Sequence, residues 1–221
     1  MVRHAPAVAS LCETFRGTWR RVGPVKRPFL VALDLTDRRC LVVGRSPEAA
    51  RRATALLEAG AQVTVVGESP CPELEALAHR GDIELHRRSA VPADLDDTWL
   101  AVVTDAPRTL ADELGAHAAE RRVWFCAVDL PDHNSYAHVA IARAGLVNVG
   151  ISTGGRAPAL GRRLREELER VFDEAGLADF AEYLARRRTR LPSGKRGEVL
   201  GRAVRDLAFE GRLKLPEQQD E

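Results

Sequence analysis

The 221-residue sequence has no excess of charge of either sign and no long apolar run. It holds 33 Lys and Arg residues against 32 Asp and Glu residues, so the formal net charge is +1. A dedicated nucleic-acid-binding protein would show a basic excess, and we expect no such partner. No stretch approaches the roughly 20 apolar residues that span a bilayer, and the N-terminus lacks the apolar core of a secretory signal. We therefore predict a cytoplasmic protein with no membrane contact.

Cysteine is also scarce. The four cysteines are Cys12, Cys40, Cys71 and Cys126, and no two of them form a Cys-x-x-Cys pair. In a chain of this size the pattern favours reduced thiols and argues against a zinc site built from them. We predict no protein-bound metal.

What the sequence does contain is the pattern of a βαβ unit. The apolar strand Arg39–Val43 ends in Gly44, a helical stretch ends at Gly60, and a second apolar strand, Gln62–Val66, leads to Glu68. Units of this length bind dinucleotides, with an acidic residue after the second strand holding a ribose hydroxyl. Glu68 is thus a candidate ribose-binding residue, which would favour NAD over NADP. The alternative is that Glu68 is a solvated turn residue.

The turn after the first strand lacks the glycines of a phosphate-binding loop. A dinucleotide signature would read G-x-G-x-x-G, whereas this turn reads Gly44-Arg45-Ser46-Pro47-Glu48-Ala49. A side chain at position 46 obstructs the close approach of the backbone to a pyrophosphate. Arg45 could contact a phosphate in its place. Fold and cofactor must therefore be predicted separately.

Further strands alternate with helices downstream. We expect strands at Ile83–His86, 99–103 and 123–128, and helices at Pro72–His79 and 109–120. This alternation predicts an α/β fold with a Rossmann-like, doubly wound parallel sheet. Ligands of such sheets bind outside the carboxyl ends of the strands. The residues expected there are Gly44, Glu68, Thr104, Asp105 and Asp129.

The chain becomes mostly helical after Asp129. We expect a strand at 146–151 and helices at about 157–172, 178–188 and 197–209. The turn before the first of these helices reads Ser152-Thr153-Gly154-Gly155-Arg156. Hydroxyls and free N–H groups at a helix N-terminus favour an anion, although an ordinary N-cap explains the same residues.

Several separated blocks resemble the dehydrogenase–chelatase module of siroheme biosynthesis. That family comprises precorrin-2 dehydrogenases, bifunctional precorrin-2 dehydrogenase/sirohydrochlorin ferrochelatases, and the N-terminal half of siroheme synthase. After an apolar lead-in at 29–35, the matching blocks are residues 56–66, 99–105, 127–131 and 151–169. The resemblance covers roughly residues 28–170 in order.

This sequence departs from the family pattern at three places. Gly44, Arg45 and Ser46 stand where the family has three consecutive glycines. Ala127 replaces an asparagine two residues before the aspartate, and Tyr136-Ala137-His138-Val139 replaces a Phe-x-Phe-Pro stretch. These positions surround the expected cofactor and tetrapyrrole sites.

The resemblance makes Asp129 the general acid/base for dehydrogenation and for removing pyrrole protons before metal insertion. A carboxylate suits both steps because each moves a proton within hydrogen-bond reach. A capping or loop aspartate is the alternative. Thr104 and Asp105 would line the nicotinamide side of the cleft, or form a turn that caps the next helix.

The resemblance also implies a site for a tetrapyrrole substrate, which carries many carboxylates. Ser152, Thr153, Gly154, Gly155 and Arg156 would bind these carboxylates, with Arg143 adding charge if it faces the same cleft. His133 and His138, after Asp129, would contact the substrate. A metal held by single histidines without ligand spacing is the less favoured interpretation.

We therefore predict an NAD(P)-dependent enzyme that oxidises precorrin-2 to sirohydrochlorin, with iron insertion as a further activity and iron as its substrate. One alternative is a dinucleotide-independent chelatase or other tetrapyrrole-modifying enzyme. The other is a catalytically silent tetrapyrrole-binding or partner protein. The resemblance implies a homodimer. The predicted parts are an extension at 1–27, a Rossmann-like domain at 28–130, a dimerisation and active-site segment at 131–156, a helical domain at 157–215 and a tail at 216–221.

Overall fold

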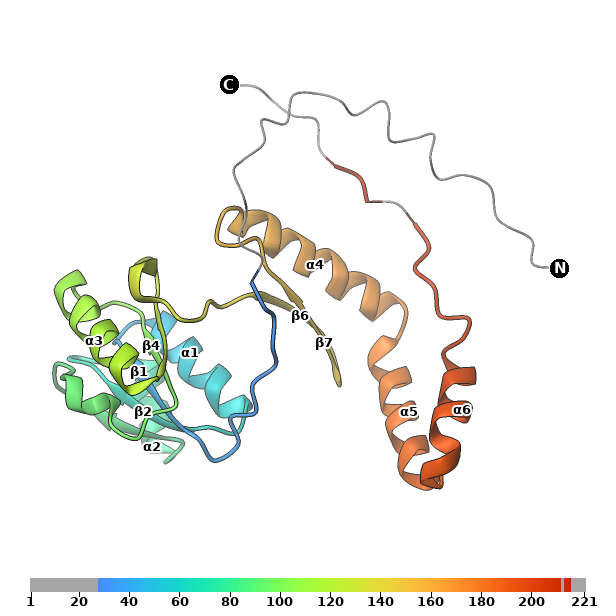
Figure 1. Ribbon diagram of the computed structural model, residues 1–221, viewed down its shortest axis with the longest axis horizontal. Coiled ribbons are helices and arrows are strands. Elements are labelled where there is room, and N and C mark those ends of the chain that lie inside the picture. Colours follow the sequence, from blue (N-terminus) through green and yellow to red (C-terminus); the bar gives the residue numbers. More distant parts are fainter. Residues whose placement is uncertain (1–27, 212, 216–221) are drawn as a thin grey trace. The chain divides into compact units, whose positions relative to one another are not determined.

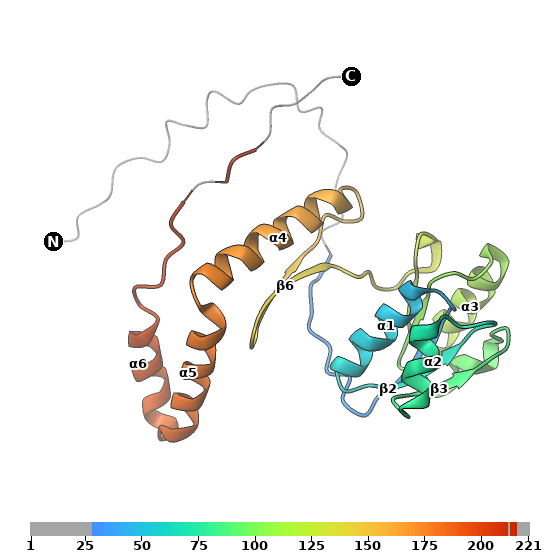
Figure 2. The ribbon, with the colours of Figure 1, turned by 180° about the vertical axis from the view of Figure 1, so that it is seen from behind.

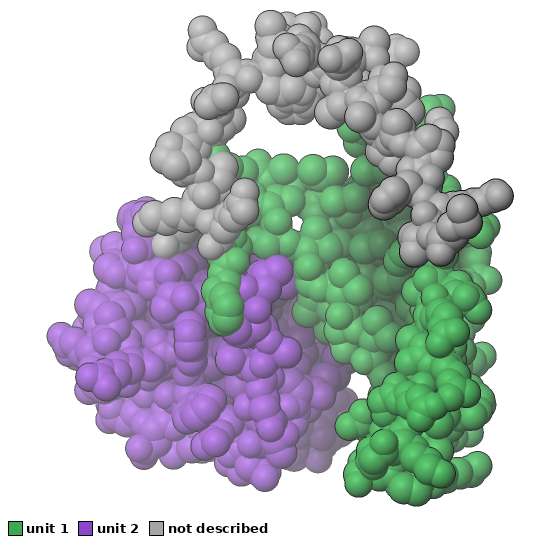
Figure 3. Space-filling model, turned by 45° about the vertical axis from the view of Figure 1, so that its right-hand side comes forward, with its two compact units in different colours: residues 1–29, 140–221 green, residues 30–139 purple. Residues whose placement is uncertain are grey.

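The computed structural model describes residues 28–211 and 213–215. It divides into two compact units, one spanning Leu30–Val139 and the other built from Ala140 onward (Figures 1 and 3). The predicted extension at 1–27 and tail at 216–221 lie outside the described residues. No helix in the described part of the chain is both long enough and apolar enough to cross a membrane.

The first unit is a five-stranded parallel sheet in the order β3-β2-β1-β4-β5 (Figure 1). Its strands are β1 (Arg39–Val43), β2 (Gln62–Val66), β3 (Ile83–His86), β4 (Leu100–Val103) and β5 (Trp124–Ala127). The strand order reverses between β1 and β4, which is the switch point where such sheets bind ligands. The predicted Rossmann-like fold is confirmed.

Helices cover both faces of this sheet. On one face, α1 (Pro47–Glu58) and α2 (Pro72–His79) pack on a core that includes Val42, Val65 and Val102 (Figure 2). On the other face, α3 (Arg108–Arg121) and the 3-10 helix η2 (Pro92–Leu95) pack on a second core. The strands are therefore apolar on both sides, as parallel strands covered by crossover helices must be.

The segment after β5 stays with the sheet. It contains the 3-10 helix η3 (Pro131–His133), and the first compact unit runs on to Val139. Two polar side chains, Asn134 and Ser135, hydrogen-bond to the backbone of β5. Because these bonds occupy the edge of β5, the compact unit extends nine residues beyond 130, the end of the predicted domain.

The second unit is an antiparallel hairpin followed by helices. Its elements are β6 (Ala140–Ala144), β7 (Val147–Ile151), α4 (Pro158–Glu174), α5 (Leu177–Arg190) and α6 (Ser193–Ala203). Strand β6 was not predicted, and the last helix ends six residues before position 209. The buried apolar core consists of Ala142, Ala144 and Phe172, a small set for a unit of this length.

Candidate functional site

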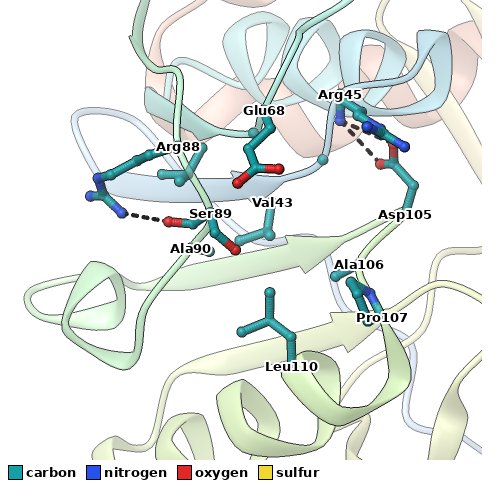
Figure 4. Close-up of a pocket in the computed structure, with 13 residues that line it drawn as sticks. Val43, Arg45, Glu68, Arg88, Ser89, Ala90, Asp105, Ala106, Pro107 and Leu110 are labelled. Carbon is teal, nitrogen blue, oxygen red and sulfur yellow. Dashed lines mark hydrogen bonds between the residues drawn. The ribbon is translucent and has the colours of Figure 1, made fainter.

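The carboxyl ends of β1, β2 and β4 enclose a pocket of about 430 Å³ (Figure 4). Its apolar lining includes Val43, Val66 and Leu110, and its polar lining includes Glu68 and Asp105. The volume falls within the range of roughly 300–1,000 Å³ that small-molecule sites occupy. The pocket therefore lies where the strand order predicts a ligand.

Two glycines let the loops of this pocket approach one another. A Cβ on Gly44 would overlap the Thr104 hydroxyl and the Asp105 carboxylate. A Cβ on Gly67, directly after β2, would overlap the Gly44 carbonyl oxygen. Gly44 was a predicted site residue, whereas Gly67 was not. The signal that could have found it is a glycine placed immediately after a buried strand.

The Asp105 carboxylate occupies the turn that follows β1. It accepts hydrogen bonds from the Arg45 N–H at 3.1 and 3.2 Å and from the Ser46 N–H at 3.1 Å. The Thr104 hydroxyl also bonds to this carboxylate. Ser46 stands at the N-cap of α1, but its side chain makes no capping hydrogen bond. Two N–H groups at the start of α1, those of Arg45 and Ser46, are thus bonded by an acidic side chain of the same chain.

Glu68 follows β2 and directs its exposed side chain into the pocket (Figure 4). The guanidinium of Arg88, on the neighbouring wall, donates to the Asp94 carboxylate at 2.8 Å and to the Ser89 carbonyl at 3.0 Å. Arg88 is therefore already paired. Of the predicted cofactor-binding residues, four line this single pocket, namely Gly44, Arg45, Glu68 and Asp105, whereas Ser46 and Thr104 are not among its lining residues.

Asp129 lies in a strained turn at the end of β5. Its backbone is left-handed, with φ +62°, and its side chain is exposed. Residues other than glycine rarely adopt this conformation, which is more common at functional positions. Within the described residues its carboxylate has no hydrogen-bond partner, so it caps no helix there, while its exposed position in a turn fits the loop aspartate that was the other alternative.

Asn134 fixes the loop that carries Asp129. Its Oδ1 accepts from the Ala127 N–H at 2.7 Å, and its Nδ2 donates to the Ala127 carbonyl at 3.1 Å. Ser135 likewise bonds to the backbone of β5, because its Oγ accepts from the Phe125 N–H at 2.8 Å. Neither Asn134 nor Ser135 was predicted, because a pair of small polar residues shortly after an edge strand is a weak signal.

His133 and His138 lie on opposite faces of the sheet. The His133 side chain packs against Gly115 of α3, with its Nε2 3.5 Å from an Asp112 carboxylate oxygen. The His138 ring meets Tyr136, which packs on the α1 face, in an edge-to-face contact at 5.2 Å. Partial desolvation of the ring, together with the positive charge of Arg52, lowers the pKa of His138 to about 4, although His138 keeps contact with solvent. The structure does not bring the two histidines together.

The Ser152–Arg156 turn belongs to the second unit. Gly154 and Gly155 have left-handed φ values of +62° and +74°. The Thr153 hydroxyl oxygen accepts from the Ala157 N–H at 3.3 Å, and the Ser152 hydroxyl oxygen accepts from the Gly154 N–H at 3.3 Å. Arg156 is exposed. The Thr153 bond reaches the N-cap residue Ala157 and no N–H of the first helical turn, and α4 has no side-chain cap, so this bond is not the helix cap that was weighed as the alternative to an anion site.

The fold and pocket define an α/β protein of the dinucleotide-binding class, and comparisons with known proteins agree. Residues 31–140 match a family described as a proposed NAD(P)-binding domain, and residues 149–170 match the central region of sirohaem biosynthesis proteins. The chain belongs to the family of sirohaem biosynthesis proteins that these two matches describe.

Individual relatives support this assignment. Siroheme synthase 2 of Cronobacter sakazakii is 35% identical over 156 residues, which is 70% of this chain and 34% of that protein. Siroheme synthase 2 of Klebsiella pneumoniae is 33% identical over 158 residues, with 72% and 34% covered. The chain thus spans about a third of the length of these relatives. A solved structure of SirC, a precorrin-2 dehydrogenase, matches with a TM-score of 0.69 at 23% identity, over 81% of this chain and 90% of that one.

Proposed function

We propose that this protein is an NAD-dependent oxidoreductase of siroheme biosynthesis that converts precorrin-2 to sirohydrochlorin. The observation that carries the proposal is the position of Asp129. Its exposed carboxylate stands at the same edge of the sheet as the pocket, after the strand next to β4, in a chain of this family.

The pocket suits the adenosine half of a nicotinamide cofactor. Glu68 would hold the ribose hydroxyls and oppose the 2′-phosphate of NADP, so NAD is the expected form. The backbone donors for a pyrophosphate are present at Arg45 and Ser46, although Asp105 accepts their hydrogen bonds. A cofactor therefore fits once this carboxylate has moved.

A bound nicotinamide supplies the hydride acceptor for the oxidation. Asp129 takes the proton that leaves the macrocycle, because its carboxylate is exposed and has no partner among the described side chains. Substrate carboxylates would lie at the Arg156 turn, where a guanidinium and the start of α4, a helix without a side-chain cap, favour anions. In metal insertion Asp129 would accept pyrrole protons, with iron as the substrate.

A dinucleotide-independent chelatase remains the second candidate. The observation that favours it is the turn after β1, where side chains replace glycines and a carboxylate takes the N–H donors. Asp129 serves this reaction without any change in its position.

We also propose that the chain acts as a homodimer. The second unit has a small core and leaves large apolar side chains exposed, among them Leu146 at 57%, Tyr183 at 48% and Leu207 at 57%. Such surface is typical of contact regions between subunits. Light scattering of the purified protein that detected only a 24.2 kDa species would contradict this.

The test of the function is Asp129→Asn, assayed by sirohydrochlorin formation from precorrin-2 with NAD. We expect turnover to fall about 10²–10⁴-fold with little change in melting temperature. Asp37→Asn is the matched control, because Asp37 is also exposed and left-handed, with φ +57°, but precedes β1 at the opposite edge. Equal turnover per folded molecule in Asp129→Asn and wild type would reject the role of Asp129. Wild type that inserts iron into sirohydrochlorin yet never oxidises precorrin-2 would favour the chelatase.

A further inference from the structure

The turn after β1 holds a carboxylate where a dinucleotide-binding fold holds a pyrophosphate. The Asp105 oxygens lie 3.1–3.2 Å from the Arg45 and Ser46 nitrogens, which is ordinary hydrogen-bond distance. These two N–H groups stand at the start of the 12-residue helix α1, where the helix dipole adds to their attraction for an anion. Asp105 and Arg45 also line the pocket itself (Figure 4).

Gly44 explains why the carboxylate fits there. A Cβ at Gly44 would overlap the Asp105 Oδ1 atom and the Thr104 hydroxyl. The one glycine that this turn keeps therefore makes room for Asp105 and Thr104. Positions 45 and 46 can carry side chains because their N–H groups already face a protein group.

We infer that Asp105 is an intramolecular occupant of the pyrophosphate site and limits how tightly the cofactor binds. This inference rests on the proposed function, since it concerns the cofactor of that site. A carboxylate and a pyrophosphate are both anions and compete for the same two donors, so binding requires the Asp105 side chain to rotate away. Asp105 is exposed, and the space it would swing into is open to solvent. A nucleoside without phosphates binds in the pocket without displacing it.

The competition predicts which ligands respond to a change at Asp105. In Asp105→Asn the side chain keeps an oxygen that can accept one N–H but loses its charge. Affinity for ADP and for NAD should rise on the order of tenfold or more, because the like-charge repulsion is gone. Affinity for adenosine should stay the same. Replacing Arg45 and Ser46 by glycine while Asp105 remains should tighten NAD binding far less than Asp105→Asn does.

The experiment is isothermal titration of the full chain with adenosine, ADP and NAD, using wild type, Asp105→Asn, Asp105→Ala and the control Asp37→Asn. The Asp105→Ala variant serves if Asp105→Asn proves unstable, and melting temperatures show that each variant is folded. Tighter ADP and NAD binding in the Asp105 variants alone, with adenosine unchanged, supports the inference. Equal ADP and NAD affinities in wild type and the Asp105 variants, with adenosine bound by all, overturn the inference and leave the proposed cofactor use standing. Absence of binding of all three ligands to every variant overturns the proposed cofactor use, and the inference with it.

Discussion

Replacing Asn134 by alanine should loosen the loop that carries Asp129. The Asn134 amide makes two hydrogen bonds with the backbone of Ala127, at 2.7 and 3.1 Å, and Ala127 is only 2% exposed. These bonds serve the open edge of β5, whose other edge pairs with β4. Asn134→Ala removes both hydrogen-bond partners, so the buried N–H and carbonyl of Ala127 are left without a protein partner.

The cost follows from that geometry. An unsatisfied buried donor costs about 1–3 kcal/mol, and the carbonyl adds less where water can reach it, so we take about 2 kcal/mol. For a unit the size of Leu30–Val139 each kcal/mol lowers the melting temperature by about 4 °C, which predicts a fall of roughly 8 °C. Turnover should fall as well, because Asp129 would sample more conformations.

Calorimetry measures the first effect, and amide hydrogen exchange at Ala127 locates it. Asn148→Ala is the matched control, since Asn148 is exposed on β7 and belongs to the other unit. Asn134→Asp gives an independent check, because it sets a carboxylate oxygen against the Ala127 carbonyl and should raise the pKa of the introduced carboxyl. Its stability should then be greatest at low pH and be lost as pH rises. An Asn134→Ala protein that melts within about 2 °C of wild type would refute the reasoning.

Two other predictions concern the pocket and the His138 ring. Gly67→Ala should weaken adenosine binding, because the new Cβ would overlap the Gly44 carbonyl and push the two loops apart. Gly81→Ala, at an open turn, is the control for the loss of a glycine. Equal affinities for adenosine in the two variants would contradict the prediction. The pKa of His138 is about 4 in the folded protein, below its ordinary value of 6.5, so the unfolded chain takes up the proton first as pH falls. The His138 ring should therefore leave stability unchanged above pH 6.5 and lower it between pH 6.5 and about 4. The loss should be modest because His138 is partly solvent-exposed. In His138→Gln the melting temperature should change less with pH across that window. A parallel decline in wild type and variant would assign the acid sensitivity to other groups.

The fold of the first unit could be predicted because its local signals agree. β1, β2, α2 and β3 begin and end at the predicted residues, since Gly, Pro and short apolar runs mark each boundary. Strand β6 was missed because its sequence, Ala-Ile-Ala-Arg-Ala, has little strand preference of its own. It is a strand because β7 pairs with it and α4 packs on Ala142 and Ala144. Such tertiary stabilisation leaves little trace in one segment.

The candidate site was predictable at the level of strand ends and not at the level of side-chain contacts. Parallel strands bring their carboxyl ends to one edge, so Gly44, Glu68 and Asp105 were expected to meet, and one pocket contains them. Which group accepts the turn's N–H bonds depends on the course of two loops that are 60 residues apart. The same reason hid the separation of His133 and His138, since the loop between them crosses from one face of the sheet to the other.

Gly44, after β1, and Gly67, after β2, are both required where another group comes close to the backbone, whether that group belongs to a ligand or to the protein. Gly44 remains because Asp105 and Thr104 crowd it, and Gly67 remains because the Gly44 carbonyl does. Neither contact involves a ligand, so a count of glycines says little about cofactor binding in this chain. Asp129 is held separately, through the Asn134 bonds to β5, and its position does not depend on the turn. The dehydrogenase and chelatase proposals therefore share one catalytic group and differ in whether NAD binds at the turn that Asp105 occupies. Oxidation of precorrin-2 with NAD by the wild-type protein, set against its iron insertion into sirohydrochlorin, is the measurement that separates them.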